Sequence, residues 1–340
     1  MQALPAPHLF ALLLALAAVA STSVAAQEGL DVSAFEMVVA QDGSGDHTTI
    51  QAAIDAARAF PYGRVDIFVR DGVYAEQVVV PSWNARISLV GESVEGTVLT
   101  HDAHFESIDR GRNSTFHTAT LRVSGDDFHA RNLTVINSAG PVGQALALFV
   151  EGDRAVFEGC RFIGHQDTIY ASGEGHRQYF RDCVIEGTTD FVFGNATAVF
   201  DNCHILAKAD SYITAASTPE GVPFGFVFFD GVVTASPGVE GVYLGRPWRD
   251  HAQTTFVRTH LDLPVRPEGW HDWGRPETHA TVVYTEIATT GPGADPSGRV
   301  PWSRQLDEAP GSTPAAIFAS VARPWDPDPE WFRRAIPDIE

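Results

Sequence analysis

The sequence predicts an all-β fold in which short strands stack coil upon coil as a parallel β-helix. One pattern recurs along the chain: an aromatic residue is followed three positions later by a small or polar residue and then by an apolar one. Each segment alternates like a strand and ends in turn residues, and long helical patterns are absent between segments. Units this short cannot bury their own apolar faces, so they must stack on one another. The segments begin at Phe128, Phe157, Phe180, Phe200 and Phe228, at steps of 29, 23, 20 and 28 residues.

The composition is that of a folded chain with an acidic surface. Of the 340 residues, 44% are hydrophobic and 19% are charged, which excludes a disordered chain. The 23 Lys and Arg residues are outnumbered by 43 Asp and Glu residues, which gives a formal net charge of −20. A surface of that charge repels phosphate backbones, so a nucleic-acid partner is not expected.

The first 26 residues have the pattern of a secretory signal peptide. An apolar run spans residues 9–19, and Val24 and Ala26 occupy the −3 and −1 positions of a cleavage site before Gln27. The run is shorter than the roughly 18 apolar residues that a membrane helix needs, and no other segment approaches that length. We therefore expect a secreted protein, extracellular or periplasmic, with no membrane partner.

Residues 36–330 are expected to form one domain whose two ends are built differently. An open β-helix end would expose apolar side chains, and residues 48–60 predict a short helix that caps it. Thr48 with Gln51 resembles a capping box, and Ile50, Ala53, Ile54 and Ala57 form an apolar stripe. After Gly291 a tail rich in Pro and Gly is expected to pack along the outside of the β-helix through Ile317, Phe318 and Trp325.

Three cysteines occupy the same position of the repeat, so they are expected on neighbouring coils. Cys160 and Cys183 lie 23 residues apart, and Cys183 and Cys203 lie 20 apart. Either pair is close enough for a disulfide, and an odd number leaves at least one thiol unpaired within a monomer. A stack of three buried free thiols is the alternative.

The repeat also aligns carboxylates. Asp167, Asp190 and Asp210 each follow a cysteine of the repeat by seven residues, so Asp167 and Asp190 should face each other one coil apart, with Asp210 as a third member. Two close carboxylates cannot both ionise easily; one pKa rises, which provides an acid and a nucleophile or base from the same residue type.

Two neutral amides are expected beside these acids. Counting back 23 residues from Asp167 leads to Gln144, and Gln166 directly precedes Asp167. Uncharged N–H donors next to a nucleophilic carboxylate are what a developing oxyanion in acyl transfer requires. A structural ladder of amides and carboxylates inside the β-helix would produce the same spacing.

Seven ordered segments of the chain resemble the pectin methylesterases (pectinesterases). The tail segments Gly291–Ala294 and Arg299–Trp302 are also similar to that family, and the stretch from Tyr212 to Thr218 resembles its bacterial members. The resemblance covers roughly residues 38–330. The seven segments are Asp42–Asp46, Thr49–Ile54, Asp71–Glu76, Gly143–Leu148, His165–Tyr170, Thr189–Ala196 and Leu244–Arg249.

The resemblance implies a right-handed β-helix and a role for each catalytic residue. Asp190 would be the nucleophile, and Asp167 would be the acid that protonates methanol and then the base that activates water. Gln144 and Gln166 would bind the oxyanion. Arg246 would hydrogen-bond Asp190 and keep it ionised.

The substrate that the resemblance implies is methyl-esterified homogalacturonan, or pectin, bound by a monomer that needs no cofactor. Trp248 would flank the sugar-binding cleft, because an aromatic face stacks on a pyranose ring. The 13 histidines are scattered, and no metal site is expected. Further candidates for sugar contact are Tyr170, Phe193, Tyr243, Phe116 and Trp270.

Two other functions remain as alternatives to the esterase. A glycoside hydrolase that cleaves the pectin chain uses paired carboxylates on a related β-helix, and a column of three Asp would suit it. A noncatalytic carbohydrate-binding β-helix would release no methanol. A serine esterase is not expected, because Ser93 in Gly91–Glu95 lacks the final Gly of the nucleophile motif.

Overall fold

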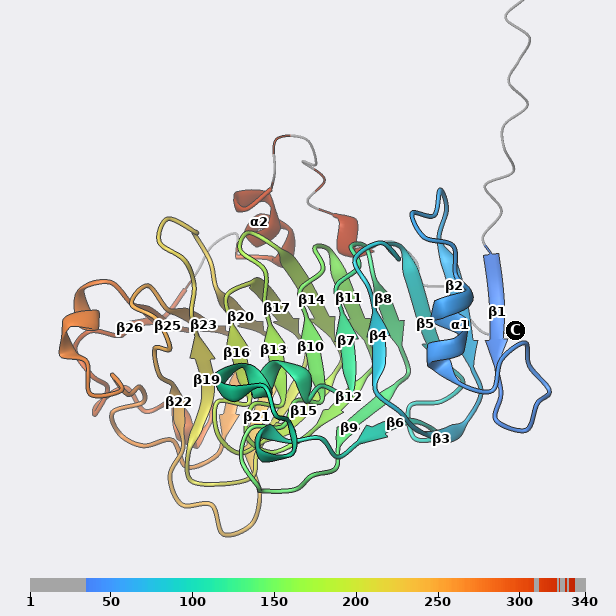
Figure 1. The fold of residues 1–340 in the computed structure, drawn as a ribbon. Helices are drawn as coiled ribbons and strands as arrows, with labels where there is room; N and C mark the ends of the chain where they lie inside the picture. The colour runs from blue at the N-terminus through green and yellow to red at the C-terminus, as the bar shows by residue number, and fades with distance from the viewer. Residues whose placement is uncertain (1–34, 309–311, 323, 325–327, 329, 334–340) are drawn as a thin grey trace, which may run out of the picture. The chain divides into compact units, whose positions relative to one another are not determined.

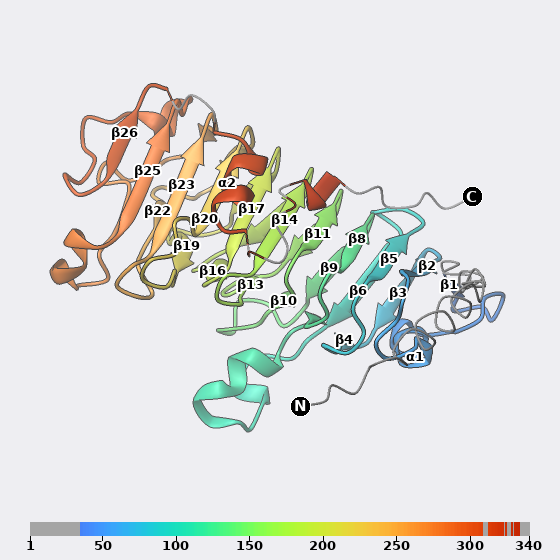
Figure 2. The same cartoon turned by 90° about the horizontal axis from the view of Figure 1, so that it is seen from above.

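Three parallel sheets wind around one apolar core and form a right-handed parallel β-helix (Figures 1 and 2). The computed structural model describes residues 35–308, 312–322, 324, 328 and 330–333. Each strand pairs with a strand of the next coil, and every registered pair is parallel. The predicted all-β fold class is therefore confirmed.

The sheets are named here A, B and C. Sheet A contains β1 (Phe35–Val39), β2 (Val65–Val69), β5 (Ile87–Gly91), β8 (His129–Arg131), β11 (Ala155–Glu158), β14 (Arg177–Arg181), β17 (Thr197–Asp201), β20 (Phe226–Phe229), β23 (Gln253–Val257), β25 (Val283–Ile287) and β26 (Arg304–Leu306). Sheet B contains β3 (Gly72–Ala75), β6 (Thr97–His101), β9 (Thr134–Asn137), β12 (Arg161–Ile163), β15 (Val184–Gly187), β18 (His204–Ala207), β21 (Val232–Ala235) and β24 (His260–Asp262). Sheet C contains β4 (Val78–Val80), β7 (Leu121–Val123), β10 (Leu148–Val150), β13 (Ile169–Ala171), β16 (Val192–Gly194), β19 (Tyr212–Ala216) and β22 (Tyr243–Gly245).

The predicted repeat forms a ladder of phenylalanines inside the β-helix. Phe157 pairs in register with Phe180, and their rings stack 4.7 Å apart at 12°. The same stacking continues to Phe200, Phe228 and Phe256, with centroids 4.5–4.7 Å apart. All of these rings are buried, so the ladder contributes to the core along the whole stack.

The first segment of the predicted repeat is shifted by two residues. Phe157 pairs with Ala130 and not with Phe128. Phe128 is nevertheless buried, and its ring lies 5.8 Å from that of Phe157 at 49°. The small Ala130 occupies the ladder position, and Phe128 fills core space beside it, so the predicted register of this segment is wrong by two residues.

Cys160, Cys183 and Cys203 are all buried free thiols. They lie on neighbouring coils, as their repeat position predicted, and the Sγ atom of Cys183 donates to the carbonyls of Arg181 and Phe157. Burial raises the pKa of Cys160 and Cys183 well above the usual value. The structure thus corresponds to the alternative of three stacked free thiols.

The predicted capping helix is α1 (Ile50–Ala56), at the N-terminal end of the β-helix (Figure 1). Its N-cap is Thr49, whose hydroxyl accepts from Ala52 N at 3.2 Å, so the predicted Thr48–Gln51 capping box is wrong by one residue. The stripe of Ile50, Ala53 and Ile54 is buried against the core as expected.

The C-terminal tail first extends the β-helix and then packs on its outside. β26 pairs in parallel with β25 as the last strand of sheet A. Beyond it, α2 (Pro314–Ser320) and the short 3₁₀ helix η5 (Trp331–Arg333) cover the outer face of sheet A, where Ile317 and Phe318 are buried as predicted. Trp325 lies outside the described residues. Within them, no helix is long and apolar enough to cross a membrane.

Candidate active site

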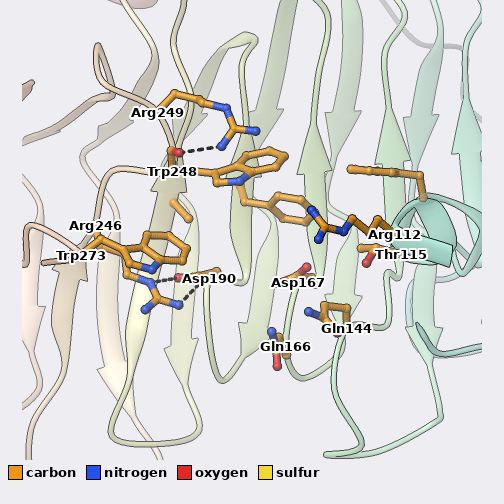
Figure 3. A pocket seen from close by; sticks show the side chains of 13 residues that line it. Arg112, Thr115, Gln144, Gln166, Asp167, Asp190, Arg246, Trp248, Arg249 and Trp273 are labelled. Atoms are coloured by element: carbon orange, nitrogen blue, oxygen red, sulfur yellow. Dashed lines mark hydrogen bonds and ion pairs between the residues drawn. The ribbon is translucent and has the colours of Figure 1, made fainter. Parts of the chain in front are cut away.

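A cleft of about 410 Å³ opens on the outer face of sheet C (Figure 3). Its floor belongs to the turns and strands around β13, β16 and β19, and one wall is η2 (Gly111–His117), a 3₁₀ helix preceded by η1 (Phe105–Ser107). The cleft is lined by Arg112, Thr115, Phe116, Gln144, Gln166, Asp167, Asp190, Phe193, Ala215, Arg246, Trp248, Arg249 and Trp273. All five residues predicted to be catalytic are in this set.

Asp167 and Asp190 lie at equivalent positions of adjacent coils, as predicted. Each stands two residues before a registered pair, Ile169 with Val192, and each has a left-handed backbone, with φ of 65° and 50°. Such a conformation is uncommon for residues other than Gly, Asn and Asp. It sharply redirects the chain at the start of the strand, and both side chains line the cleft.

Arg246 forms a two-pronged ion pair with Asp190. Its Nε donates to Oδ1 at 2.9 Å and its Nη2 donates to Oδ2 at 2.7 Å. Burial raises the pKa of Asp190 above its usual value, and the guanidinium of Arg246 acts in the opposite direction. Desolvation of a carboxylate that is only 6% exposed therefore outweighs the effect of the guanidinium on this pKa.

Asp167 is a buried carboxyl group, and no guanidinium in the described part of the chain is bound to it. Burial and the charge of Asp190 raise the pKa of Asp167 well above its usual value, while the more distant charge of Arg246 lowers it. Asp190 therefore loses its proton first, because only Asp190 is bound by a cation. The two carboxyl groups therefore titrate apart, with Asp167 holding its proton to higher pH than Asp190.

Gln144 and Gln166 lie side by side at one end of the cleft. Their backbones form a parallel bridge between coils, and both side chains line the cleft beside Asp167 (Figure 3). Gln144 is thus the counterpart of Gln166, 22 residues away, and not of Asp167 as the count of 23 predicted. Two neutral amide groups therefore border Asp167.

Asp210 does not extend the carboxylate column. Tyr212 occupies the third position, since it stands two residues before Thr214, the registered partner of Val192. Its carbonyl accepts from Asp190 N at 2.8 Å. The turn between the paired residues Ala207 and Thr214 is two residues longer than that between Gly187 and Val192. Asp210 lies exposed in this longer turn, where it accepts from the backbone N–H groups of Glu240 and Gly241.

Comparison with known proteins agrees with this geometry. Residues 36–319 match the family model described as Pectinesterase. Pectinesterase 31 of Arabidopsis thaliana is 40% identical over 281 residues, which cover 80% of this chain and 88% of that protein. The chain belongs to the pectinesterase family. The predicted family and enzyme class, a carboxylic ester hydrolase, are confirmed.

Solved pectin methylesterases have the same fold. The pectin methylesterase from carrot superposes with a TM-score of 0.77 at 32% identity and covers 84% of this chain and 93% of its own. A pectin methylesterase in complex with a hexasaccharide superposes with a TM-score of 0.72 at 29% identity, over 83% and 96%. Two further relatives from Arabidopsis thaliana are named as both a pectinesterase and a pectinesterase inhibitor. The match covers only 58% and 52% of their length.

The structure divides the predicted sugar-contacting aromatics into two groups. Trp248, Phe193 and Phe116 line the cleft, and Tyr170 packs against all three of these rings. Trp270 does not line the cleft: it is 1% exposed and stacks on Tyr284 in the core. Tyr243 also lies outside the cleft lining.

Five further residues line the cleft that the sequence did not identify as site residues: Arg112, Thr115, Ala215, Arg249 and Trp273. Arg249 ends a family motif already recognised, and Trp273 follows Trp270 by three residues in a Gly-bounded segment, so a signal existed for both. Arg112 and Thr115 lie on the short η2 helix, where no periodic pattern distinguishes them. Neither Arg112 nor Arg249 pairs with a carboxylate among the described residues.

Proposed function

We propose that this chain removes methyl groups from methyl-esterified homogalacturonan and releases methanol and a free galacturonate carboxylate. The observation that carries the proposal is the asymmetric pair: Asp190 is held by Arg246, and Asp167 beside it keeps its proton to higher pH. One acid is prepared for attack and the other for proton donation. Family membership supplies the chemical class of ester.

In the first half-reaction, an oxygen of Asp190 attacks the ester carbonyl carbon. The carbonyl oxygen gains the negative charge of the tetrahedral intermediate, and the side-chain N–H groups of Gln144 and Gln166 stabilise it. Collapse breaks the bond to the methoxy oxygen, which takes the proton of Asp167 and leaves as methanol. The galacturonyl group is now bound to Asp190 as an anhydride.

In the second half-reaction, Asp167 is a carboxylate and accepts a proton from water. The hydroxide attacks the galacturonyl carbonyl carbon, and the bond to the Asp190 oxygen breaks. The products are a galacturonic acid group, which then loses its proton to solvent and becomes the carboxylate, a regenerated Asp190 carboxylate bound to Arg246, and a protonated Asp167. One water is consumed and one methanol is released in each cycle.

The test is methanol release from highly methylated pectin, with reducing ends measured in the same samples. The wild-type chain should release methanol without new reducing ends, and Asp190→Ala should release none. Asp210→Ala is the matched control, since this Asp is exposed in a turn outside the cleft, and it should behave like the wild type. New reducing ends without methanol would identify a glycoside hydrolase, and binding without either product would identify a carbohydrate-binding protein.

We further propose that the protein acts as a secreted monomer whose mature chain begins at Gln27. The predicted signal peptide, residues 1–26, lies outside the described residues, so the proposal depends on the sequence pattern. Sequencing the N-terminus of exported protein and measuring its mass by light scattering test both parts. An uncleaved N-terminus or a dimer mass would contradict the respective part.

A further inference from the structure

The guanidinium of Arg246 lies between two aromatic rings. Its Cζ is 3.6 Å from the ring centroid of Trp273 and 3.9 Å from that of Tyr212. Both distances are well inside the roughly 6 Å over which a cation is attracted to a ring face. Figure 3 shows Trp273 beside Arg246, whose Nε and Nη2 are directed at Asp190.

The loop that carries Trp273 is held by hydrogen bonds of its own residues and of η3 (Pro276–Ala280). Trp273 has a left-handed backbone, with φ of 59°, and its N–H donates to His271 Nδ1 at 2.9 Å. Asp272 accepts from Gly274 N at 2.8 Å, and its other oxygen lies 3.0 Å from His279 Nε2. His279 belongs to η3, so the turn is held on both sides.

The same loop is anchored in the core three residues earlier. Trp270 stacks on Tyr284 with centroids 4.3 Å apart at 7°, and its Nε1 donates to Glu286 Oε1 at 3.2 Å. Glu286 is in turn paired with Arg299, whose Nε donates to it at 2.8 Å; both side chains are almost fully buried. A further 3₁₀ helix, η4 (Pro292–Ala294), supplies the Gly293 carbonyl to Arg299. A tryptophan in the core therefore fixes the loop that places another tryptophan on the surface.

We propose that Trp273, together with Tyr212, is a positioning residue that holds Arg246 in the plane of the Asp190 carboxylate. The inference rests on the proposed function and extends it to a residue that does not itself touch the reacting atoms. A guanidinium stacked on both faces loses the freedom to rotate out of that plane, and its two N–H donors stay aligned with the two carboxylate oxygens. Without the two rings, the guanidinium of Arg246 would be hydrogen-bonded to Asp190 in only part of the molecules.

The competing role for Trp273 is contact with the sugar ring, since it is 37% exposed and lines the cleft. The two roles differ in kinetics. A sugar-stacking residue binds substrate and transition state alike, so its loss raises KM. A residue that orients the nucleophile through Arg246 acts on the chemical step, so its loss lowers kcat.

The kinetic test compares Trp273→Leu, Trp273→Phe and Tyr212→Leu on methylated pectin. Trp273→Leu and Tyr212→Leu should each lower kcat by about 5- to 30-fold with KM within about twofold, as expected for the loss of a partly desolvated cation–π contact. Trp273→Phe keeps a ring face and should restore most of kcat. Trp83→Leu is the matched control, an exposed tryptophan outside the cleft lining, and should leave both constants unchanged. A raised KM with an unchanged kcat in Trp273→Leu would overturn the proposal.

A second measurement does not depend on catalysis. The Nε–H resonance of Arg246, assigned by its loss in Arg246→Lys, should be shifted by the ring currents of two stacked rings in the wild type. The shift should decrease in Trp273→Leu and largely persist in Trp273→Phe. An Arg246 resonance that does not move in Trp273→Leu would refute the proposed positioning of Arg246 by Trp273, even if the wild type released methanol. If the wild type releases no methanol but the shift is observed, the proposed reaction is refuted, whereas the contact of Trp273 with Arg246 is supported.

Discussion

The interior and the outer face of the same coils differ in how residue types recur from one coil to the next. Inside, one residue type recurs at each step: Phe157, Phe180, Phe200 and Phe228 are stacked at nearly constant spacing. Outside sheet C, the equivalent position is occupied in turn by Asp167, Asp190, Tyr212 and Tyr243. Both positions belong to the same coils, and they differ in whether the side chain must pack in the core.

This difference shows how a repetitive fold obtains an active site. A buried stack must be filled at uniform density, so each coil needs a side chain of similar shape. The outer face has no such requirement, and neighbouring positions about 4.7–4.9 Å apart can carry different chemical groups. Asp190 and Asp167 differ in pKa because only one of them is bound by Arg246, which the structure places against a single coil.

The largest expected effect comes from changing the outer face without touching the interior. Asp167→Asn and Asp190→Asn should each lower kcat on the order of 10³-fold, and the double variant should lose little more, because the two acids act as a unit. Neither change should lower the unfolding midpoint, since no core contact is lost. Methanol assays and thermal unfolding of the three variants check this. Additive losses of activity would show that the two carboxylates act independently.

The reverse change removes one ring from the interior ladder. Phe180→Ala should reduce the free energy of unfolding by about 3–5 kcal/mol, because a cavity opens between two stacked rings that lie 4.7 Å away on either side. Denaturant unfolding measures the loss, and Phe180→Leu is the milder control. The fraction of Phe180→Ala that remains folded should keep the wild-type kcat; a lower kcat would mean that the interior also controls the site.

The acid of the pair should make stability depend on pH. Asp167 holds its proton to higher pH in the folded than in the unfolded chain, so folding stability falls as pH rises from about 4, the unfolded value, through the folded pKa. Asp167→Asn lacks this decline. Its free energy of unfolding should equal that of the wild type near pH 3.5 and exceed it at pH 7, by about 1.4 kcal/mol for each unit of pKa elevation. Equal stability of the two proteins at pH 7 would contradict the raised pKa.

The smallest effect concerns the interior cysteines. Cys183→Ala should cost about 1 kcal/mol of unfolding free energy, as for a small buried side chain that loses its packing. A reductant should leave the wild-type unfolding midpoint unchanged, because the three thiols are free. Thiol titration in denaturant without reductant should find three thiols per chain. Finding a single thiol would show that two of them form a disulfide in the exported protein.

The sequence alone determined the features that depend on constant spacing. Phe157, Phe180 and Phe200 recur with the strands themselves, so the core ladder and the stacking of Cys160 and Cys183 were predictable. The spacing of seven residues from cysteine to aspartate placed Asp167 and Asp190 one coil apart. The motif around Arg246 led to the family. Within these two coils the cysteine-to-aspartate spacing is the same, so sequence distance converts directly into position in space.

Only the tertiary structure decided what lies in the turns. Two extra residues between Ala207 and Thr214 expose Asp210 and place Tyr212 next to Asp190. Trp270 and Trp273 are three residues apart, yet one is in the core and the other covers Arg246. Turn length and a left-handed residue change the direction of the chain without any periodic signal, so these contacts follow from packing between coils and not from the order of residues.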